Sequence, residues 1–533
     1  MNLGEALAMP TPITPHDLQH RLSDEAPIAL IDVRDPPEYN ASHIVGASLI
    51  PRRMLEFELS HAVPRPDTPI VLCDEDEQRV HYAAATAEAM GYSDVSTLSG
   101  GTNRWAFLDL PTEWGVNVPS KDFGERVEVV HHVPEIDADD LHARIERGDQ
   151  LVILDTRTPE EYRRACIPSG RSMPGGELAF RITDVLEDAP PDATVVVNCA
   201  GRTRSIIGTR VLQRMSLERE VVGLKNGTAG WMLAGHELEF GADRDDLPSV
   251  TPQGQAAAER YARRCADEDG VQLIGIDELD ELRERSASES VYFIDVRTGS
   301  EHEAGHIPGF RWFPGGQAVQ RSDDVAVVHH APIVFACDGV ARAALTASWY
   351  RQMGHRHIYA LEGGAGAWTA AGRTLASGVE REELLLLRQA RESVKLVEPS
   401  DAFDPRDARV VHVGTSQEFA DGHPPRAEWD ARAWLERSIE TYDDEPIITI
   451  CESGEQSLLA AHSLIQRGRT DVTAVAGGMV AYREARLPIE EGLTGVLSPP
   501  NDILAFGPQR GYADMQHYLR WEIALGEKYA PQD

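Results

Sequence analysis

One stretch of the sequence places a cysteine, two arginines and a serine close together. It is the segment Val195-Val196-Val197-Asn198-Cys199-Ala200-Gly201-Arg202-Thr203-Arg204-Ser205. The β-branched residues predict a buried strand, and residues 206–215 predict a helix. Loop N–H groups and the N-terminus of a helix converge at such a strand end and stabilise an anion there. A free thiol has a pKa near ~8.5, and this setting lowers it. Cys199 is therefore predicted to be an anionic sulfur nucleophile.

The chain contains this arrangement four times, as two strands that lead to a loop and then a helix. The first strand ends in D-x-R in three copies, at Asp32, Asp155 and Asp295, and a glutamate follows it in all four. The second strand leads to the loop cysteines, which are Cys73, Cys199, Cys337 and Cys451. Each copy closes on a glycine turn and an aromatic residue. The period of roughly 115–140 residues makes each copy long enough to be a domain.

Strands that alternate with helices predict an α/β fold made of four tandem domains. Each domain is expected to hold a small, mostly parallel sheet with helices on both faces. The predicted domains are residues 10–117, 134–240, 270–378 and 398–490, followed by a tail over 491–533. The tail is expected to end in an amphipathic helix over 512–529 that docks on a domain face. Residues 116–135 are predicted to be an extended linker, and 253–266 a helix.

These motifs together resemble the rhodanese (thiosulfate sulfurtransferase) family. The resemblance rests on the D-x-R strand, the turn His306-Ile307-Pro308-Gly309, the pattern C-x-x-x-x-R-S before a helix, and the late G-G…W. It covers nearly the whole chain, as four rhodanese-like domains. It implies that Cys199 takes sulfane sulfur from thiosulfate or a related persulfide donor and passes it to cyanide or a thiol. The implied binding loop is Ala200, Gly201, Arg202, Thr203, Arg204 and Ser205, with Arg204 as the family's loop arginine and Arg202 as a second cation.

The third and fourth loops are weaker candidates for the same chemistry. Cys337 and Arg342 keep the family spacing, but Asp338 should raise the thiol pKa and repel an anionic donor. Sulfur chemistry at Cys337 therefore stays an open alternative. In the fourth loop, which begins at Cys451, Gln456 stands where the arginine would be, so a structural or relay role is favoured there. The candidate catalytic residues are Cys199, Cys337 and Cys451.

The first loop depends on its alignment. Counting back from the helix, Arg79 matches Arg204, which places Asp74 at the nucleophile position and makes Cys73 the last strand residue. Residues 74–77 are all acidic, so the first repeat is expected to be inactive. A second register begins the loop at Cys73 and makes it one residue longer, as in phosphatases of the same fold, but the acidic residues would repel phosphate.

Composition limits the partners. The net charge of −36 argues against nucleic acid or an anionic membrane as a partner. The sequence has no run of about 18 apolar residues, so no membrane span is predicted. Six scattered cysteines without a C-x-x-C pair, and no visible signal peptide, favour the cytoplasm. No metal or other cofactor is predicted, and the oligomeric state is left open. The alternative function is a non-catalytic scaffold or sulfur-relay protein, and phosphatase chemistry ranks last.

Overall fold

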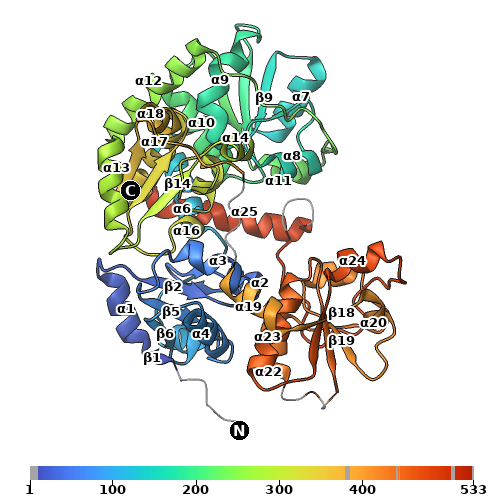
Figure 1. Ribbon diagram of the computed structural model, residues 1–533. Coiled ribbons are helices and arrows are strands. Elements are labelled where there is room, and N and C mark those ends of the chain that lie inside the picture. Colours follow the sequence, from blue (N-terminus) through green and yellow to red (C-terminus); the bar gives the residue numbers. More distant parts are fainter. Residues whose placement is uncertain (1–9, 379–383, 440–441, 443–444, 506–509, 531–533) are drawn as a thin grey trace. The chain divides into compact units, whose positions relative to one another are not determined.

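The computed structural model describes residues 10–378, 384–439, 442, 445–505 and 510–530 (Figure 1). It contains four five-stranded sheets, one in each repeat. Neighbouring strands in these sheets are parallel, and all four sheets share one strand order: first, fifth, fourth, second, third. The predicted α/β class with four mostly parallel sheets is confirmed.

The first two repeats have short strands and helices on both sides of the sheet. The first sheet consists of β1 (Thr11–Ile13), β2 (Ala29–Asp32), β4 (Ser48–Leu49), β5 (Ile70–Cys73) and β6 (Val95–Leu98). Its helices are α1 (Pro15–Ser23), α2 (Pro36–Ala41), α3 (Leu55–Ala62), α4 (Val80–Ala89) and α5 (Gly101–Phe107), and β3 (His43–Ile44) pairs with β7 (Thr112–Glu113). The second sheet consists of β8 (Glu135–Ile136), β9 (Leu151–Asp155), β10 (Arg171–Ser172), β11 (Thr194–Asn198) and β12 (Val221–Leu224). Its helices are α7 (Ala138–Arg147), α8 (Pro159–Arg164), α9 (Leu178–Glu187), α10 (Thr203–Arg214) and α11 (Gly227–Leu233).

The last two repeats follow the same plan. The third sheet consists of β13 (Gln272–Ile274), β14 (Tyr292–Asp295), β15 (Arg311–Trp312), β16 (Ile333–Ala336) and β17 (Ile358–Leu361). Its helices are α13 (Ile276–Arg285), α14 (Gly299–Ala304), α15 (Gly315–Gln320), α16 (Ser322–Val325), α17 (Ala341–Met353) and α18 (Gly364–Ala370). The fourth sheet consists of β18 (Lys395–Val397), β19 (Arg409–His412), β20 (Glu428–Trp429), β21 (Ile447–Ile450) and β22 (Val472–Val475). Its helices are α20 (Pro399–Phe403), α21 (Ser416–Asp421), α22 (Arg432–Ser438), α23 (Glu455–Gln466) and α24 (Gly478–Glu484).

The central strand of each sheet leads directly to the candidate loop. These strands, β5, β11, β16 and β21, are buried along their whole length, as expected for parallel strands covered on both faces. They end at Cys73, Asn198, Ala336 and Ile450. Each loop therefore begins one residue later, at the carboxyl edge of its sheet.

The D-x-R motif forms an internal ion pair beside the loop. In the second repeat, Arg157 Nη2 lies 2.7 Å from Asp155 Oδ2 and donates a second hydrogen bond to the Ala165 carbonyl. The same carboxylate accepts from the Asn198 side chain, which ties β9 to the end of β11. The first and third repeats hold the same pair; the fourth has the buried His412 instead.

Two of the connecting segments carry helices that the sequence predicted, and one differs. Helix α12 (Pro252–Asp269) and the tail helix α25 (Tyr512–Gly526), which η5 (Glu527–Tyr529) extends, agree with the predictions. Helix α19 (Leu385–Ser393) precedes the fourth sheet, and residues 379–383 before it lie outside the described residues. None of the described helices has the length and apolarity that crossing a bilayer would require.

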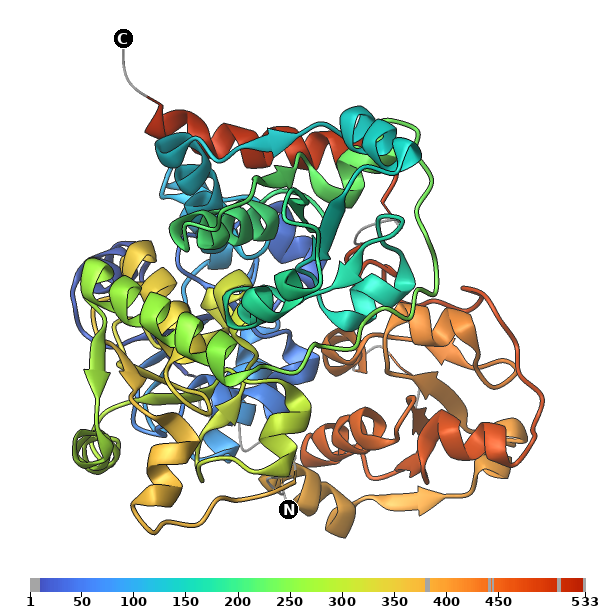
Figure 2. The same cartoon turned by 90° about the horizontal axis from the view of Figure 1, so that it is seen from above.

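The prediction of an extended linker over residues 116–135 is wrong, because most of this segment is helix α6 (Val118–His131). Pro119 lies in the first turn, where its missing N–H has no partner to lose. Phe123 and Val127 are buried, and α25 packs on α6 (Figure 2). Tyr529 of η5 also donates a hydrogen bond to Asp122 at 2.6 Å. Burial against tertiary partners therefore outweighs the polar composition of the segment.

Contacts divide the chain into two units that interleave in sequence. Unit 1 comprises Met1–Val116, Val327–His329 and Arg381–Leu504, so it joins the first repeat to the fourth. Unit 2 comprises Asn117–Ala326, His330–Glu380 and Ala505–Asp533, so it joins the second repeat to the third and includes α25.

Within each unit the two repeats meet through equivalent segments, which we call the interface segments. They follow the third strand of each sheet and comprise residues 50–57, 173–180, 313–320 and 430–437. In unit 1 they hold a buried network of four charges. Arg52 lies 3.1 Å from Glu56 and 2.7 Å from Glu436, and Arg432 also pairs with Glu56. All four side chains are at most 3% exposed, so each charge depends on its partners for the solvation it has lost.

In unit 2 the interface segments meet through backbone. A Cβ atom added to Gly176 would lie 2.7 Å from the Gly316 nitrogen, and one added to Gly316 would lie 2.8 Å from the Gly176 nitrogen. Glycine is required at both positions because no side chain fits between these two backbone segments. Units 1 and 2 thus use the same structural position in two different ways.

The buried network predicts a strong asymmetry between two arginines of α22. We expect Arg432→Leu to destabilise unit 1 by about 3–5 kcal/mol, because Glu56 would lose one of its two cations inside the protein. Arg437→Leu is the matched control, since Arg437 is exposed on the same helix, and we expect it to cost about 0.5–1 kcal/mol. Calorimetry of the full chain measures both. Equal shifts in the two variants would contradict the role given to the network.

Candidate active site

The first repeat shows what its loop can hold. The Asp74 carboxylate accepts hydrogen bonds from the backbone N–H groups of Glu77 and Arg79 at 2.6 Å, and from those of Asp76 and Val80 at 3.2 Å. Burial raises the pKa of Asp74, and these donors oppose the rise. The loop is therefore an anion-binding cradle at the end of β5, and here a carboxylate fills it.

A shared hydrogen bond aligns the four loops. The first turn of the helix that follows the fifth strand donates to the carbonyl of the first loop residue: Thr102 to Asp74, Thr228 to Cys199, Ala365 to Cys337 and Met479 to Cys451, at 2.7–2.9 Å. Asp74 therefore holds the position of the three cysteines. Cys73 is the last residue of β5, as the first of the two predicted registers requires.

The Cys199 side chain lies at the same point of the second repeat. It is 2% exposed, and its sulfur lies 3.4 Å from the Ser205 hydroxyl, which itself donates to the Arg202 carbonyl at 2.8 Å. The N–H groups that bind Asp74 in the first repeat belong here to Gly201, Arg202, Arg204 and Ser205. These positions follow from the alignment of Cys199 with Asp74, and Ala200 and Thr203 lie between them in the loop backbone.

The glycine turn noted in the sequence holds the loop in place. Gly227 has φ +53°, and a Cβ atom there would lie 2.2 Å from the Cys199 carbonyl oxygen. Gly364 and Gly478 make the same close approach to Cys337 and Cys451. The turn brings the N-terminus of α11 against the loop, which is possible only without a side chain.

Arg204 lies in the site, paired with a glutamate. Its guanidinium binds both oxygens of Glu161, at 2.7 and 3.0 Å. Burial opposes ionisation of Glu161, but Arg204 lowers its pKa to about 2. Arg79 and Arg342 bind Glu38 and Glu301 in the same way. This glutamate recurs in all four repeats, and that recurrence is the sequence signal from which its role could have been found.

Arg202 does not face the thiol as a second free cation. Its Nε lies 2.6 Å from Glu125 Oε1, and Nη2 lies 2.9 Å from Oε2, so it binds α6. Glu125 is buried, which raises its pKa to about 7 although Arg202 opposes this. Sequence reasoning missed this partner because Glu125 lies in the segment predicted to be a linker. Arg202 thus anchors the loop to α6.

Helix α25 covers one side of the same loop. A Cβ atom on Gly201 would lie 3.2 Å from Glu522 Oε2 and 3.5 Å from the Tyr518 ring. Glu522 is 1% exposed, and Tyr518 donates to its other oxygen at 2.6 Å. The expectation that the tail helix docks on a domain face agrees with this packing.

Burial opposes ionisation of the other two loop cysteines. Burial raises the pKa of Cys337 to about 12; Asp338 adds to the rise, and Arg342 opposes it. Burial also raises the pKa of Cys451, whose sulfur accepts from the Ser457 N–H at 3.2 Å. Cys166, the second thiol of the second repeat, is buried with Tyr162 and Ala242 away from the loop. Among the described residues, no cluster of acidic, histidine and cysteine side chains could hold a metal.

Comparison with known proteins gives results in agreement with the repeats. A family model described as a rhodanese-like domain matches residues 14–107, 137–234, 278–371 and 396–485. Among solved structures, a thiosulfate sulfurtransferase from Pseudomonas aeruginosa is 34% identical, covers 97% of each chain and superimposes with a TM-score of 0.88.

Curated relatives match shorter parts. The probable adenylyltransferase/sulfurtransferase MoeZ of Mycobacterium tuberculosis is 38% identical over 95 residues, which are 18% of this chain and 24% of MoeZ. A thiosulfate sulfurtransferase of Azotobacter vinelandii is 27% identical over 256 residues, which are 38% of this chain and 87% of the relative. The match thus spans about a quarter of the first relative and most of the second.

The close approach at Gly227 gives a testable prediction. We expect Gly227→Ala to cost about 2–4 kcal/mol of stability, since both its positive φ and the contact with the Cys199 carbonyl oppose a Cβ. Gly235→Ala is the matched control: its φ is +87°, and nothing lies within 4 Å of an added Cβ. It should cost about 1–2 kcal/mol, from backbone strain alone. Urea denaturation of both variants measures the difference, and equal costs would contradict the crowding described.

Proposed function

The chain belongs to the rhodanese-like domain family, and we propose that it transfers sulfane sulfur through a persulfide on Cys199. The observation that carries the proposal is the cradle in which Asp74 sits in the first repeat. In the second repeat a loop of the same length begins with a thiol, Cys199, at the position of Asp74. A cradle that accepts a carboxylate can stabilise a thiolate and a persulfide anion.

In the first step the Cys199 thiolate attacks the outer sulfur of thiosulfate. A sulfur–sulfur bond forms to Cys199, and the bond within thiosulfate breaks; its electron pair leaves with sulfite. The charge is conserved, because thiolate and thiosulfate become a persulfide anion and sulfite. The loop N–H groups support the charge on the outer sulfur.

In the second step an acceptor attacks the outer sulfur of the persulfide. Cyanide takes the sulfur as thiocyanate, or a thiolate takes it as a new persulfide, and the electron pair of the broken bond restores the Cys199 thiolate. Because Cys199 is only 2% exposed, a small donor such as thiosulfate fits the site better than a bulky one. The proposal requires neither a cofactor nor a macromolecular partner.

The other repeats have different parts in this proposal. The first repeat is non-catalytic, since Asp74 fills its cradle, and the fourth is a structural partner with Gln456 at the arginine position. All six cysteines are unpaired, which is consistent with the reducing cytoplasm proposed as the compartment.

Replacement of the nucleophile tests the proposal. We expect Cys199→Ser to lower the rate of thiocyanate formation from thiosulfate and cyanide by about 10³-fold or more, as removal of a covalent nucleophile does. Cys337→Ser is the matched control, because it changes the same position of the third loop, and it should keep the activity. Intact-mass measurement after incubation with thiosulfate should show one added sulfur atom in the natural chain. Full activity in Cys199→Ser would refute the proposal.

A further inference from the structure

In each unit, the arginine position of one loop faces the interface segment of the paired repeat. In unit 1, the Arg79 guanidinium lies 5.0 Å from the centre of the Trp434 ring. The Gln456 amide, in the other loop, lies 3.6 Å from the Met54 sulfur. The partner residues Met54 and Trp434 occupy equivalent positions, and unit 2 has Glu177 and Gln317 there. The paired repeat therefore helps to set the surroundings of each loop.

In unit 2, this position of the interface segment is charged in the second repeat, where it is Glu177, and neutral in the third, where it is Gln317. The Glu177 carboxylate reaches from the second repeat to the third, where it accepts from Arg342 Nη1 at 2.9 Å. Arg342 also binds Glu301 and Asp338, and its side chain is 1% exposed. Glu177 is itself shared with Arg181, at 2.6 Å. Arg342 is thus surrounded by three carboxylates, and little of its charge is left for an anionic donor.

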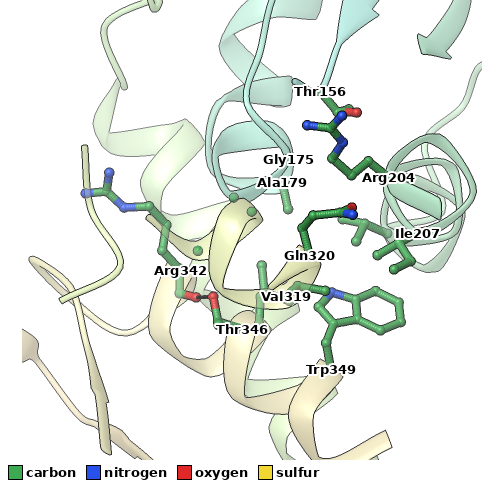
Figure 3. Close-up of a pocket in the computed structure, with 16 residues that line it drawn as sticks. Thr156, Gly175, Ala179, Arg204, Ile207, Val319, Gln320, Arg342, Thr346 and Trp349 are labelled. Carbon is green, nitrogen blue, oxygen red and sulfur yellow. Dashed lines mark hydrogen bonds between the residues drawn. The ribbon is translucent and has the colours of Figure 1, made fainter. Parts of the chain in front are cut away.

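The equivalent cation of the second repeat is less constrained. Within the described residues, Glu161 is the one carboxylate in ion-pair contact with Arg204, and the Arg204 side chain is 16% exposed. Arg204 lines a cavity of about 50 Å³ between the two repeats, and Figure 3 shows Arg342 on its opposite side with Gln320 between them. The residue of the third repeat that is equivalent to Glu177 in the interface segments is the neutral Gln317.

We propose that Glu177 is a positioning residue that keeps the third loop inactive by occupying Arg342, so that sulfur enters unit 2 at Cys199 alone. This inference rests on the proposed function. The surroundings of the second and third loops differ at two positions. Asp338 stands where the second loop has Ala200, and Glu177 stands where the other interface segment has Gln317. The first lies within the loop, and the second is supplied by the paired repeat. Both pair with Arg342 and so offset the positive charge that an anionic donor would meet in the third loop.

The test converts the third loop to the chemistry of the second. The substitution Glu177→Gln introduces glutamine, the residue found at position 317. This substitution is made in two backgrounds, the natural chain and a variant that also carries Asp338→Ala. After incubation with thiosulfate, peptide mass spectrometry reads the added sulfur on Cys199 and Cys337 separately. We expect Glu177→Gln to raise the labelling rate of Cys337 about tenfold or more in at least one background, as loss of a nearby like charge does. No rise in either background would overturn the inference.

Three controls separate positioning from damage to the fold. Glu177→Asp keeps the charge and should leave the labelling rate of Cys337 unchanged. Adding Arg342→Leu to Glu177→Gln should abolish the gain, because Glu177 acts through Arg342; a gain that persists would indicate exposure by unfolding and would overturn the inference. The reciprocal change Gln317→Glu should slow labelling of Cys199. If Cys199 takes no sulfur in the natural chain, the proposed function fails, which is distinguishable from failure of the role of Glu177.

Discussion

Convergence of backbone N–H groups on one point, at the carboxyl end of a buried central strand, is the interaction on which the rest of the structure depends. These donors cannot be left without partners in the interior, so each loop needs an acceptor at its centre. The first repeat supplies a carboxylate, Asp74, from its own chain. The other three supply a thiol. Three repeated features position this loop. The D-x-R ion pair joins the strands beside the loop, and the recurring glutamate binds the loop arginine. The glycine turn packs against the carbonyl of the first loop residue.

The same backbone therefore supports different chemistry according to what surrounds it. Asp74 and Cys199 occupy one position, yet Asp74 is a carboxylate fixed by backbone hydrogen bonds, whereas Cys199 is the thiol to which the proposed function assigns sulfur exchange. The paired repeat adds a second level of control. Unit 1 brings charged side chains together at its interface and unit 2 brings glycines, so the environment of each loop is decided partly by a domain other than its own.

Local pattern was enough to predict most of the fold. The strands and the loop register with Cys73 at a strand end follow from short-range periodicity and from comparing four copies of one motif. Local pattern could not predict which side chains pair when they lie far apart in the sequence. Nothing near Arg202 in sequence points to Glu125, and nothing near Arg342 points to Glu177. Helix α6 was missed for the same reason, since its helical state depends on the surfaces that bury it.

The interleaved connectivity imposes an order on biosynthesis. The second and third repeats emerge from the ribosome one after the other, but Arg52 and Glu436, which bind each other, are 384 residues apart. At about 5–20 residues per second, the first repeat waits roughly 20–80 s for its partner. During that interval Arg52 and Glu56 lie on a surface made to be buried, next to an unfinished neighbour. The charged network of unit 1 therefore forms only after the second and third repeats have been synthesised.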